Sequence, residues 1–425
     1  MNIFDQLLAD NQIPKFVRVR HEMDHSHIDD IEGAVAQAMR RGGTLDRIKP
    51  GDSVCITAGS RDVANIARII RAICDQVKSV GAHPFIIPAM GSHAGAKAEG
   101  QRGIIEGYGV TEEAMGAPIR ASMDTEVIAH SRSGLEIHLD KFANAADFLI
   151  PVGRIKAHTD FRGEVESGIC KMLVIGMGKQ HGAYQCHKLG FKSMAANVKE
   201  FAGAIIEKKP NMFAIGLIEN AYHQTCRIEA IPAGRILEEE PPLLEYAKSR
   251  MAKVPFDQAD ILFVDETGKD ISGAGMDPNV TGRSPVLGIS RPFFQRIAVF
   301  DLTDKSHGNF GGLGSADVTT QRLYRKIDFE QTYPNGITAA EPLAVRLPAV
   351  MPSDRTAMQF ALRTATDCDW EKGPRIVWLK NTLSLSEFYI SEALIPDAEA
   401  LDNVTIVSEP MEVIFDEEGN VKELR

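Results

Sequence analysis

Hydrophobic residues between positions 53 and 88 follow the pattern of a strand, then of a helix, then of a strand again. Ser53 to Thr57 is a short, largely apolar run of strand length. In the isoleucine-rich stretch after it, apolar residues recur at spacings of three and four, the period of a helix with one buried face. Pro84 to Pro88 is a second strand-like run. A strand, a helix and a strand at this spacing predict a βαβ unit with two parallel strands and a right-handed crossover.

A third buried strand is predicted from Phe148 to Val152. Parallel strands of one sheet direct their carboxyl ends to the same edge, where ligands bind. On the assumption that all three strands share a sheet, the segments after them converge. The first segment contains Ser60 and Arg61, the second contains His93, and the third is the loop from Arg154 to His158. An arginine and two histidines at one edge make a candidate site for anion binding and proton transfer.

The alternation of strands and helices starts again in the second half of the chain. Ala259 to Val264 has the pattern of a strand, and a helix is expected from about Val318. The acidic, proline-containing segment from Glu238 to Pro242 is expected to form a turn. The second alternation and a length of 425 residues favour two domains over one.

We therefore predict an α/β protein of two α/β domains with largely parallel sheets that face a central active-site cleft. The boundary is expected near Pro255. Residues 1–254 would form the N-terminal catalytic and cofactor-binding domain, and residues 255–425 the C-terminal domain that closes the cleft.

Composition and charge narrow the classes of function. A net charge of −11 argues against a nucleic-acid partner, because phosphate binding requires a basic face. The six cysteines are scattered without metal-binding spacing, which favours reduced thiols. No run approaches the length of a membrane span, and the N-terminus lacks the pattern of a signal peptide. These features predict a cytoplasmic protein with no membrane contact.

Lys171 is the only charged residue in an apolar segment from Ile169 to Val174. A buried amine loses its charge readily and becomes a nucleophile, whereas an amine that reaches water stays an ordinary ammonium. The pattern alone does not choose between these alternatives. His181 and His187 lack the spacing of a helical zinc pair, and the segment around Lys179 lacks the spacing of a phosphate-binding loop.

Several short motifs together resemble those of the lactate racemase superfamily, whose members use a nickel-pincer nucleotide. The resemblance covers roughly residues 50–250 and is thin beyond them. The motifs are Gly91-Ser92-His93, Ile150 to His158 (IPVGRIKAH), Ser167 to Lys171 (SGICK), Cys186-His187-Lys188, Ala58 to Arg61 (AGSR) and Pro232-Ala233-Gly234.

The resemblance implies a role for each of these residues. Lys171 would bind covalently to the cofactor, pyridinium-3,5-bisthiocarboxylic acid mononucleotide, and His187 would be the protein ligand to nickel. Ser60 and Lys156 would also contact the cofactor. His93 and His158 would be the two acid/base residues, on opposite faces of the substrate. Arg61 would bind the substrate carboxylate, and Lys269 would assist from the second domain.

The implied activity is that of a racemase or epimerase, an isomerase that inverts C2 of a small anionic 2-hydroxy acid. A hydride would pass to and from the nickel-pincer nucleotide while the two histidines exchange protons with the hydroxyl. Cofactor-synthesis and nickel-insertion proteins would be the partners.

The chain also departs from the family pattern. Gly59 replaces an aspartate, the interval between His158 and Lys171 is longer than in the lactate enzymes, and no tyrosine follows the strand that ends at Val264. Asp265, Glu266 and Asp270 would suit a polyol, so we expect a 2-hydroxy acid other than lactate, such as a sugar acid.

Two other classes of function stay open on the sequence alone. One is a hydrolase or lyase with an ordinary divalent metal at His93, His158 and His187. The other is a non-catalytic hydroxy-acid binder, which would retain Arg61 but need no reactive lysine.

Overall fold

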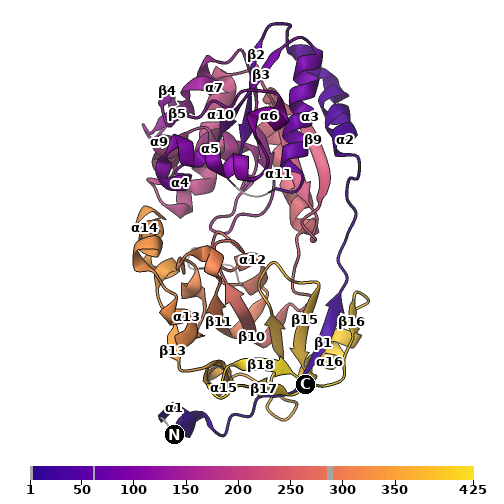
Figure 1. Ribbon diagram of the computed structural model, residues 1–425, viewed down its shortest axis with the longest axis vertical. Coiled ribbons are helices and arrows are strands. Elements are labelled where there is room, and N and C mark those ends of the chain that lie inside the picture. Colours follow the sequence, from indigo (N-terminus) through magenta and orange to yellow (C-terminus); the bar gives the residue numbers. More distant parts are fainter. Residues whose placement is uncertain (1–2, 61–62, 285–290, 340) are drawn as a thin grey trace. The chain divides into compact units, whose positions relative to one another are not determined.

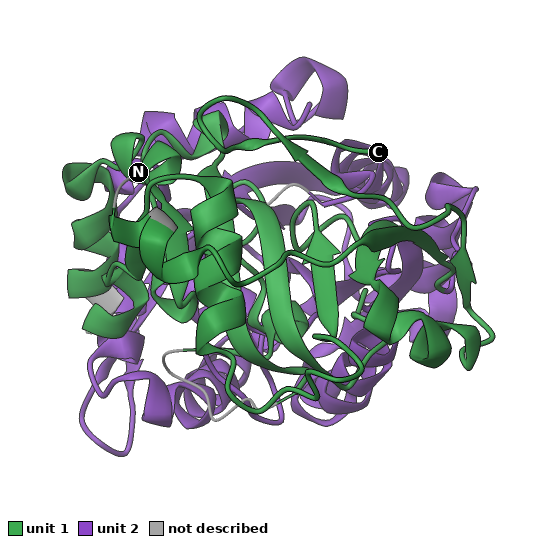
Figure 2. Cartoon of the chain, turned by 90° about the horizontal axis from the view of Figure 1, so that it is seen from below, with its two compact units in different colours: residues 1–23, 252–425 green, residues 24–251 purple. Residues whose placement is uncertain are grey.

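The computed structural model describes residues 3–60, 63–284, 291–339 and 341–425. The chain divides into two compact units, shown in different colours in Figure 2. Unit 2 comprises Asp24–Met251, and unit 1 comprises Met1–Met23 together with Ala252–Arg425.

The N-terminal segment was assigned to the wrong unit by the sequence analysis, which placed all of residues 1–254 in one domain. Strand β1 (Phe16–His21) instead pairs antiparallel with β15 (Glu387–Ser391) and with β16 (Val404–Ile406). Its side chains Phe16, Val17 and Val19 are buried in the cores of unit 1. The partners of this strand lie almost 400 residues away in the sequence, so local pattern could not identify them. The predicted cleft between the domains remains a prediction.

The βαβ unit of unit 2 is confirmed. Strand β2 (Ser53–Ala58) leads through α3 (Ile66–Ser79) to β3 (His83–Pro88), and the two strands pair in parallel. Strand β6 (Phe148–Ile150) pairs in parallel with the other edge of β2, which gives the order β3-β2-β6. The three strands therefore belong to one sheet, as the convergence of their loops requires.

Pro151 interrupts the third strand, because proline has no N–H to donate to the sheet. The chain continues directly as β7 (Val152–Arg154), which pairs in parallel with β8 (Phe213–Glu219), and β8 pairs antiparallel with β9 (Thr225–Pro232). At the interruption, the Thr57 hydroxyl accepts a hydrogen bond from Val152 N at 2.9 Å. A side chain of β2 thus serves as the acceptor for the Val152 N–H at this break in the strand.

The strands of unit 2 alternate their side chains between two cores. Val54, Ile56 and Ile86 face a core that contains α2 (Ile31–Arg40) and α3, whereas Cys55 and Phe85 face a second core. The second core contains α10 (Met194–Lys208), α11 (Ile236–Arg250) and the antiparallel pair β4 and β5. Figure 1 shows the strands between these two layers. The remaining elements are α4 (His93–Ala96), α5 (Ala98–Gly107), α6 (Glu112–Met115), β4 (Thr125–His130), β5 (Glu136–Asp140), α7 (Lys141–Ala145), α8 (Ile169–Lys171) and α9 (Lys179–His187).

Unit 1 is built on an eight-stranded sheet in the order β13-β12-β11-β10-β14-β15-β1-β16. The strands from β13 to β14 are parallel, and β15, β1 and β16 are added in antiparallel pairs. Its helices and strands, besides β1, β15 and β16, are α1 (Ile3–Leu8), β10 (Gln258–Thr267), α12 (Pro278–Thr281), β11 (Phe293–Leu302), β12 (Val318–Thr320), α13 (Gln321–Arg325), α14 (Phe329–Ala339), β13 (Ala349–Met351), α15 (Asp354–Thr364), β14 (Ile376–Leu379), α16 (Ile395–Glu399), β17 (Val413–Phe415) and β18 (Val421–Leu424). The fold class is therefore α/β in both units, as predicted.

Three local predictions were wrong. The segment from Glu238 to Pro242 lies inside α11 and not in a turn, because Leu243, Leu244 and the buried Glu240 fix it in the core despite two prolines. Val318–Thr320 is the strand β12, and the helix after it begins only at Gln321. Strand β10 continues to Thr267, so Asp265 and Glu266 belong to the strand and not to the loop.

Asp265 is a half-buried acid whose ionisation should weaken unit 1. Its pKa is raised to about 7, chiefly by burial and also by the charges of Asp354 and Glu266, while a hydrogen bond from Trp378 and the charge of Arg322 act against the rise. Between the ordinary pKa of an aspartate and pH 7 the folded chain therefore holds a proton that the unfolded chain releases, so this contribution to stability is lost as pH rises.

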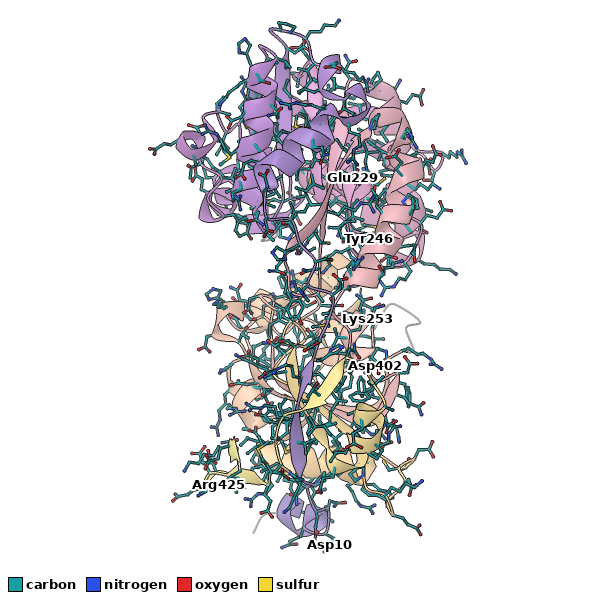
Figure 3. All side chains as sticks on the ribbon, turned by 90° about the vertical axis from the view of Figure 1, so that its right-hand side faces the viewer. Asp10, Glu229, Tyr246, Lys253, Asp402 and Arg425 are labelled. Atoms are coloured by element: carbon teal, nitrogen blue, oxygen red, sulfur yellow. The ribbon has the colours of Figure 1, made fainter. Side chains whose placement is uncertain are left out.

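We predict that Asp265→Asn increases the free energy of unfolding by about 1–3 kcal/mol at pH 8 but changes it little at pH 4. The amide keeps an oxygen for the indole N–H of Trp378, which donates to Asp265 at 2.6 Å. Urea denaturation at both pH values measures the difference. Asp402→Asn, at an exposed carboxyl of the same unit (Figure 3), is the control and should show no such dependence. An equal effect of Asp265→Asn at pH 4 and pH 8 would contradict the prediction.

Candidate active site

The loops after β2 and β3 pack directly against the segment that carries Lys171 and His187. A Cβ atom at Gly59 would lie 3.3 Å from the Met172 side chain. A Cβ atom at Gly91 would lie 3.3 Å from Ile175 and 3.7 Å from Ala183, and Gly91 has a φ of +59°, which favours glycine. The two glycines of the loops therefore pack directly against the side chains of the lysine segment.

Lys171 lies against an imidazole. Its Nζ is 2.5 Å from His158 Nε2, and the residue ends the short helix α8, just before a single π-helical turn from Met172 to Gly176. Such turns occur often at functional sites. The amine therefore has a partner within the protein and is only partly buried, and its charge state stays a prediction.

His158 is held on several sides. Its ring stacks on Phe161 with 4.2 Å between the ring centroids, and the main-chain N–H of Asp160 donates to Nδ1 at 2.9 Å. Burial is the largest cause that lowers the pKa of His158 well below its ordinary value, and the basic groups of Lys171, Lys156, His187 and Arg162 act in the same direction. The imidazole is therefore neutral at neutral pH.

His187, at the end of α9, is oriented by the main chain of its own helix. Its Nδ1–H donates to Ala183 O at 2.7 Å, which leaves the lone pair of Nε2 for another partner. Its ring packs edge-on against Phe191. Burial is the largest cause that lowers the pKa of His187, so the residue is neutral, as ligation requires.

His93 begins α4 at the end of the loop after β3. Its Nδ1–H donates to Met90 O at 2.5 Å, so Nε2 carries the lone pair and lies 3.4 Å from Ser60 Oγ. The Gln101 amide donates to Gly91 O and to His93 O. The structure thus brings His93 and Ser60 together, as the sequence predicted.

The other candidate residues differ in how far the structure describes them. The main chain of Lys156 pairs with Ser167, and its charge acts on His158. Arg61 lies outside the described residues, and its carboxylate-binding role stays a prediction. Lys269 belongs to unit 1, where its amine donates to Gly273 O at 2.6 Å. Its predicted approach to the substrate also remains a prediction.

Two buried glutamates support the site and were missed by the sequence analysis. Glu240, on α11, accepts hydrogen bonds from the main-chain N–H groups of Ile169 and Cys170, the latter at 2.8 Å. A Cβ atom at Gly168 would lie only 2.1 Å from the Glu240 carboxylate, so glycine is required there. Glu240 therefore fixes the main chain immediately before Lys171.

Glu166 does the same for the neighbouring loop. Its carboxylate accepts a hydrogen bond from His158 N at 2.7 Å and lies 3.0 Å from the Lys248 amine. Lys248 lies on α11, the helix that also carries Glu240. Figure 3 labels Tyr246 on this helix and Glu229 on the neighbouring strand β9. One helix thus supports both the His158 loop and the Lys171 segment.

Lys179 is a structural residue. Its side chain is fully buried, and its amine lies 3.2 Å from the Asp140 carboxylate and donates to Pro88 O at the end of β3. An amine engaged in this way cannot also bind phosphate, in agreement with the rejection of a phosphate-binding loop.

The described residues contain neither a cluster of metal-binding side chains nor a membrane-spanning helix. In the part of the chain that the structure describes, no group of three or more histidine, cysteine, aspartate or glutamate side chains is arranged to hold a metal ion. Among the same residues no helix is both long and apolar enough to cross a membrane.

Comparison with known proteins identifies the fold. The structure is similar to that of the lactate racemase apoprotein from Thermoanaerobacterium thermosaccharolyticum, with a TM-score of 0.52 and 15% sequence identity over 86% of this chain and 94% of that chain. No protein-family model matches the chain, and no curated protein matches it. The glycosyltransferase SsfS6 from Streptomyces sp. SF2575 aligns with a TM-score of 0.17, which is too low to indicate a common fold.

The chain is thus an α/β protein with the fold of lactate racemase. This confirms the fold that the sequence motifs led us to expect. At 15% identity the likeness concerns the fold alone.

We predict that Glu240→Ala lowers the free energy of unfolding by about 2–4 kcal/mol, because two buried N–H groups lose their acceptor and a cavity forms. Gln has the same size and keeps a side-chain oxygen as the acceptor, so Glu240→Gln should cost less than about 1 kcal/mol. Urea denaturation followed by circular dichroism measures both. Glu239→Ala, at the adjacent and more exposed position on α11, is the control. Equal losses for Glu240→Ala and Glu239→Ala would exclude the proposed support.

Proposed function

We propose that the protein is an isomerase that inverts C2 of a 2-hydroxy acid with a nickel-pincer nucleotide attached to Lys171. The observation that carries the proposal is the contact of the Lys171 amine with His158, beside a His187 whose Nε2 lone pair is free of the main chain. The lactate racemase fold of the chain supports the same class of reaction.

The donor atoms fit this cofactor. Lys171 supplies the amine for covalent attachment, and His187 Nε2 supplies one imidazole ligand. When bound, the nucleotide would supply the hydride acceptor and its own donors to nickel, and His187 would supply the ligand from the protein. The proposal therefore needs no cluster of protein ligands. Lys156 and Ser60 are the further residues proposed to contact the cofactor.

The two proposed acid/base histidines are in opposite tautomers. His93 donates from Nδ1 to Met90 O, so its Nε2 can accept the proton of a substrate hydroxyl. His158 accepts at Nδ1 from Asp160 N, so its neutral ring carries the proton on Nε2 and can donate it. One base and one acid are what inversion in a given direction requires, and the roles exchange in the reverse direction.

Substrate binding is proposed to involve Arg61 and Lys269, which would hold the carboxylate of a small anionic acid. Asp265 and Glu266 are engaged within unit 1 by Trp378 and Asn381. The proposed preference for a sugar acid over lactate therefore rests mainly on Asp270, which is exposed although its Oδ1 accepts hydrogen bonds from Thr303 and Ser306.

The alternative of an ordinary divalent metal at His93, His158 and His187 receives no support from the geometry. His158 presents Nδ1 to a main-chain N–H and Nε2 to the Lys171 amine, so neither ring nitrogen is open to a metal ion. A non-catalytic binder would have no use for an amine held in this way.

We predict that the chain, produced together with cofactor-synthesis and nickel-insertion proteins, gains the mass of the nucleotide at Lys171 and exchanges the C2 configuration of at least one acid in a panel of 2-hydroxy and aldonic acids. Lys171→Ala should abolish both results. Intact-mass measurement and chiral chromatography provide the two readouts.

His93→Gln and His158→Gln should retain the added mass but lower racemisation by at least about 100-fold, because each removes one proton-transfer group. His83→Gln, at the opposite end of β3, is the matched control. Near-normal turnover in either of the first two variants would remove that histidine from the mechanism, and an unmodified Lys171 in the fully supplied host would refute the cofactor assignment.

A further inference from the structure

The hydrogen bonds of His158 determine the protonation state of its neighbour. Because Asp160 N–H donates to Nδ1, the single proton of the neutral ring must lie on Nε2. Nε2 is also the atom that lies 2.5 Å from Lys171 Nζ. An ammonium has three donors and no lone pair, so it cannot accept from Nε2–H. The hydrogen bond from Asp160 N to Nδ1 and the bond between Nε2 and Lys171 can therefore form together only if Lys171 is the uncharged amine.

The charges around the pair favour the uncharged forms. Burial is the largest cause that lowers the pKa of His158, and the nearby cations Lys156 and Arg162 act in the same direction. The opposing group is the Asp160 carboxylate, 3.7 Å from Nδ1, which would stabilise a cation. That distance is too long for a hydrogen bond, and the main-chain N–H of the same residue already occupies Nδ1. The balance therefore lies with a neutral imidazole.

We propose that His158 holds Lys171 as an uncharged, nucleophilic amine, so that the residue condenses with the thiocarboxyl group of its own cofactor before the same imidazole serves the substrate. This inference rests on the proposed function. It adds an earlier role for His158, which acts at this stage as a positioning residue for the amine.

The attachment step balances without an oxidant or an activating nucleotide. The nitrogen of Lys171 forms a bond to the thiocarboxyl carbon, and the C–O bond at that carbon breaks. The oxygen leaves as water with one proton from the nitrogen and one from the thiocarboxyl group, while the sulfur remains in the thioamide. Only a nitrogen with a lone pair can begin this attack, so an ammonium at position 171 would be inert.

The test uses the full-length protein from a host without the cofactor-synthesis enzymes, treated with p-nitrophenyl acetate at pH 7. Peptide mass spectrometry compares acetylation of Lys171 with that of Lys372, whose side chain is 85% exposed. At pH 7 an ordinary lysine is a free amine only about once in 10³ molecules. We expect Lys171 to react at least about tenfold faster than Lys372, despite its lower exposure. A slower or equal rate at Lys171 would overturn the proposal.

Two substitutions test the part played by His158. His158→Leu removes the Nε2–H donor and should lower Lys171 acetylation at least about tenfold, whereas His158→Gln places an amide N–H near the same position and should retain most of the rate. Equal rates in the Leu variant and the parent would show that His158 does not control the amine.

A second measurement does not depend on the folding of a variant. Two-dimensional ¹H–¹⁵N correlation spectra through the ring protons distinguish the two neutral tautomers of each histidine. We expect the Nε2–H form for His158 and the Nδ1–H form for His93 and His187 in the same protein. An Nδ1–H form of His158 would overturn the proposal. Normal acetylation of Lys171 without racemase activity of the cofactor-loaded protein would instead count against the proposed function alone.

Discussion

Two buried carboxylates, Glu166 and Glu240, hold the main chain on which the candidate site depends. Glu166 accepts from His158 N, and Glu240 accepts from the N–H groups before Lys171. Hydrogen bonds from main-chain N–H groups to carboxylates are stronger than those between neutral groups, and burial makes them costly to lose. Since α11 carries Glu240 and also the Lys248 that neutralises Glu166, one helix keeps the amine and the imidazole at a fixed distance.

Local periodicity was sufficient to predict the elements that position the site. Strands β2 and β3, the helix between them and the third strand each have a pattern that is complete within a short window. The placement of Ser60 and His93 at one sheet edge then follows from the parallel connection, whereas the approach of His158 to them stays a prediction. The roles of Lys171 and His187 came from the resemblance of motifs, because a lysine in an apolar run has two physical interpretations.

Long-range partners were beyond the reach of the sequence. Nothing in residues 16–21 indicates that this strand joins a sheet formed mainly by residues 258–391. Glu240 is similarly hidden, because a glutamate beside two prolines has the composition of a turn, and only the tertiary structure shows that its carboxylate is a main-chain acceptor. Such support residues are identified by what they contact and not by any spacing in the chain.

The three histidines of the site show how the main chain can assign chemistry to identical side chains. Met90 O and Ala183 O each accept from an Nδ1–H, which exposes a lone pair on Nε2 of His93 and of His187. Asp160 N–H does the reverse at His158 and places the proton on Nε2. A carbonyl or an N–H at one ring nitrogen thus decides whether the other carries a lone pair or a proton, and with it the role that we propose for each histidine. Since these partners belong to the main chain, the assignment is made by the fold, and a histidine moved to another loop would not retain it.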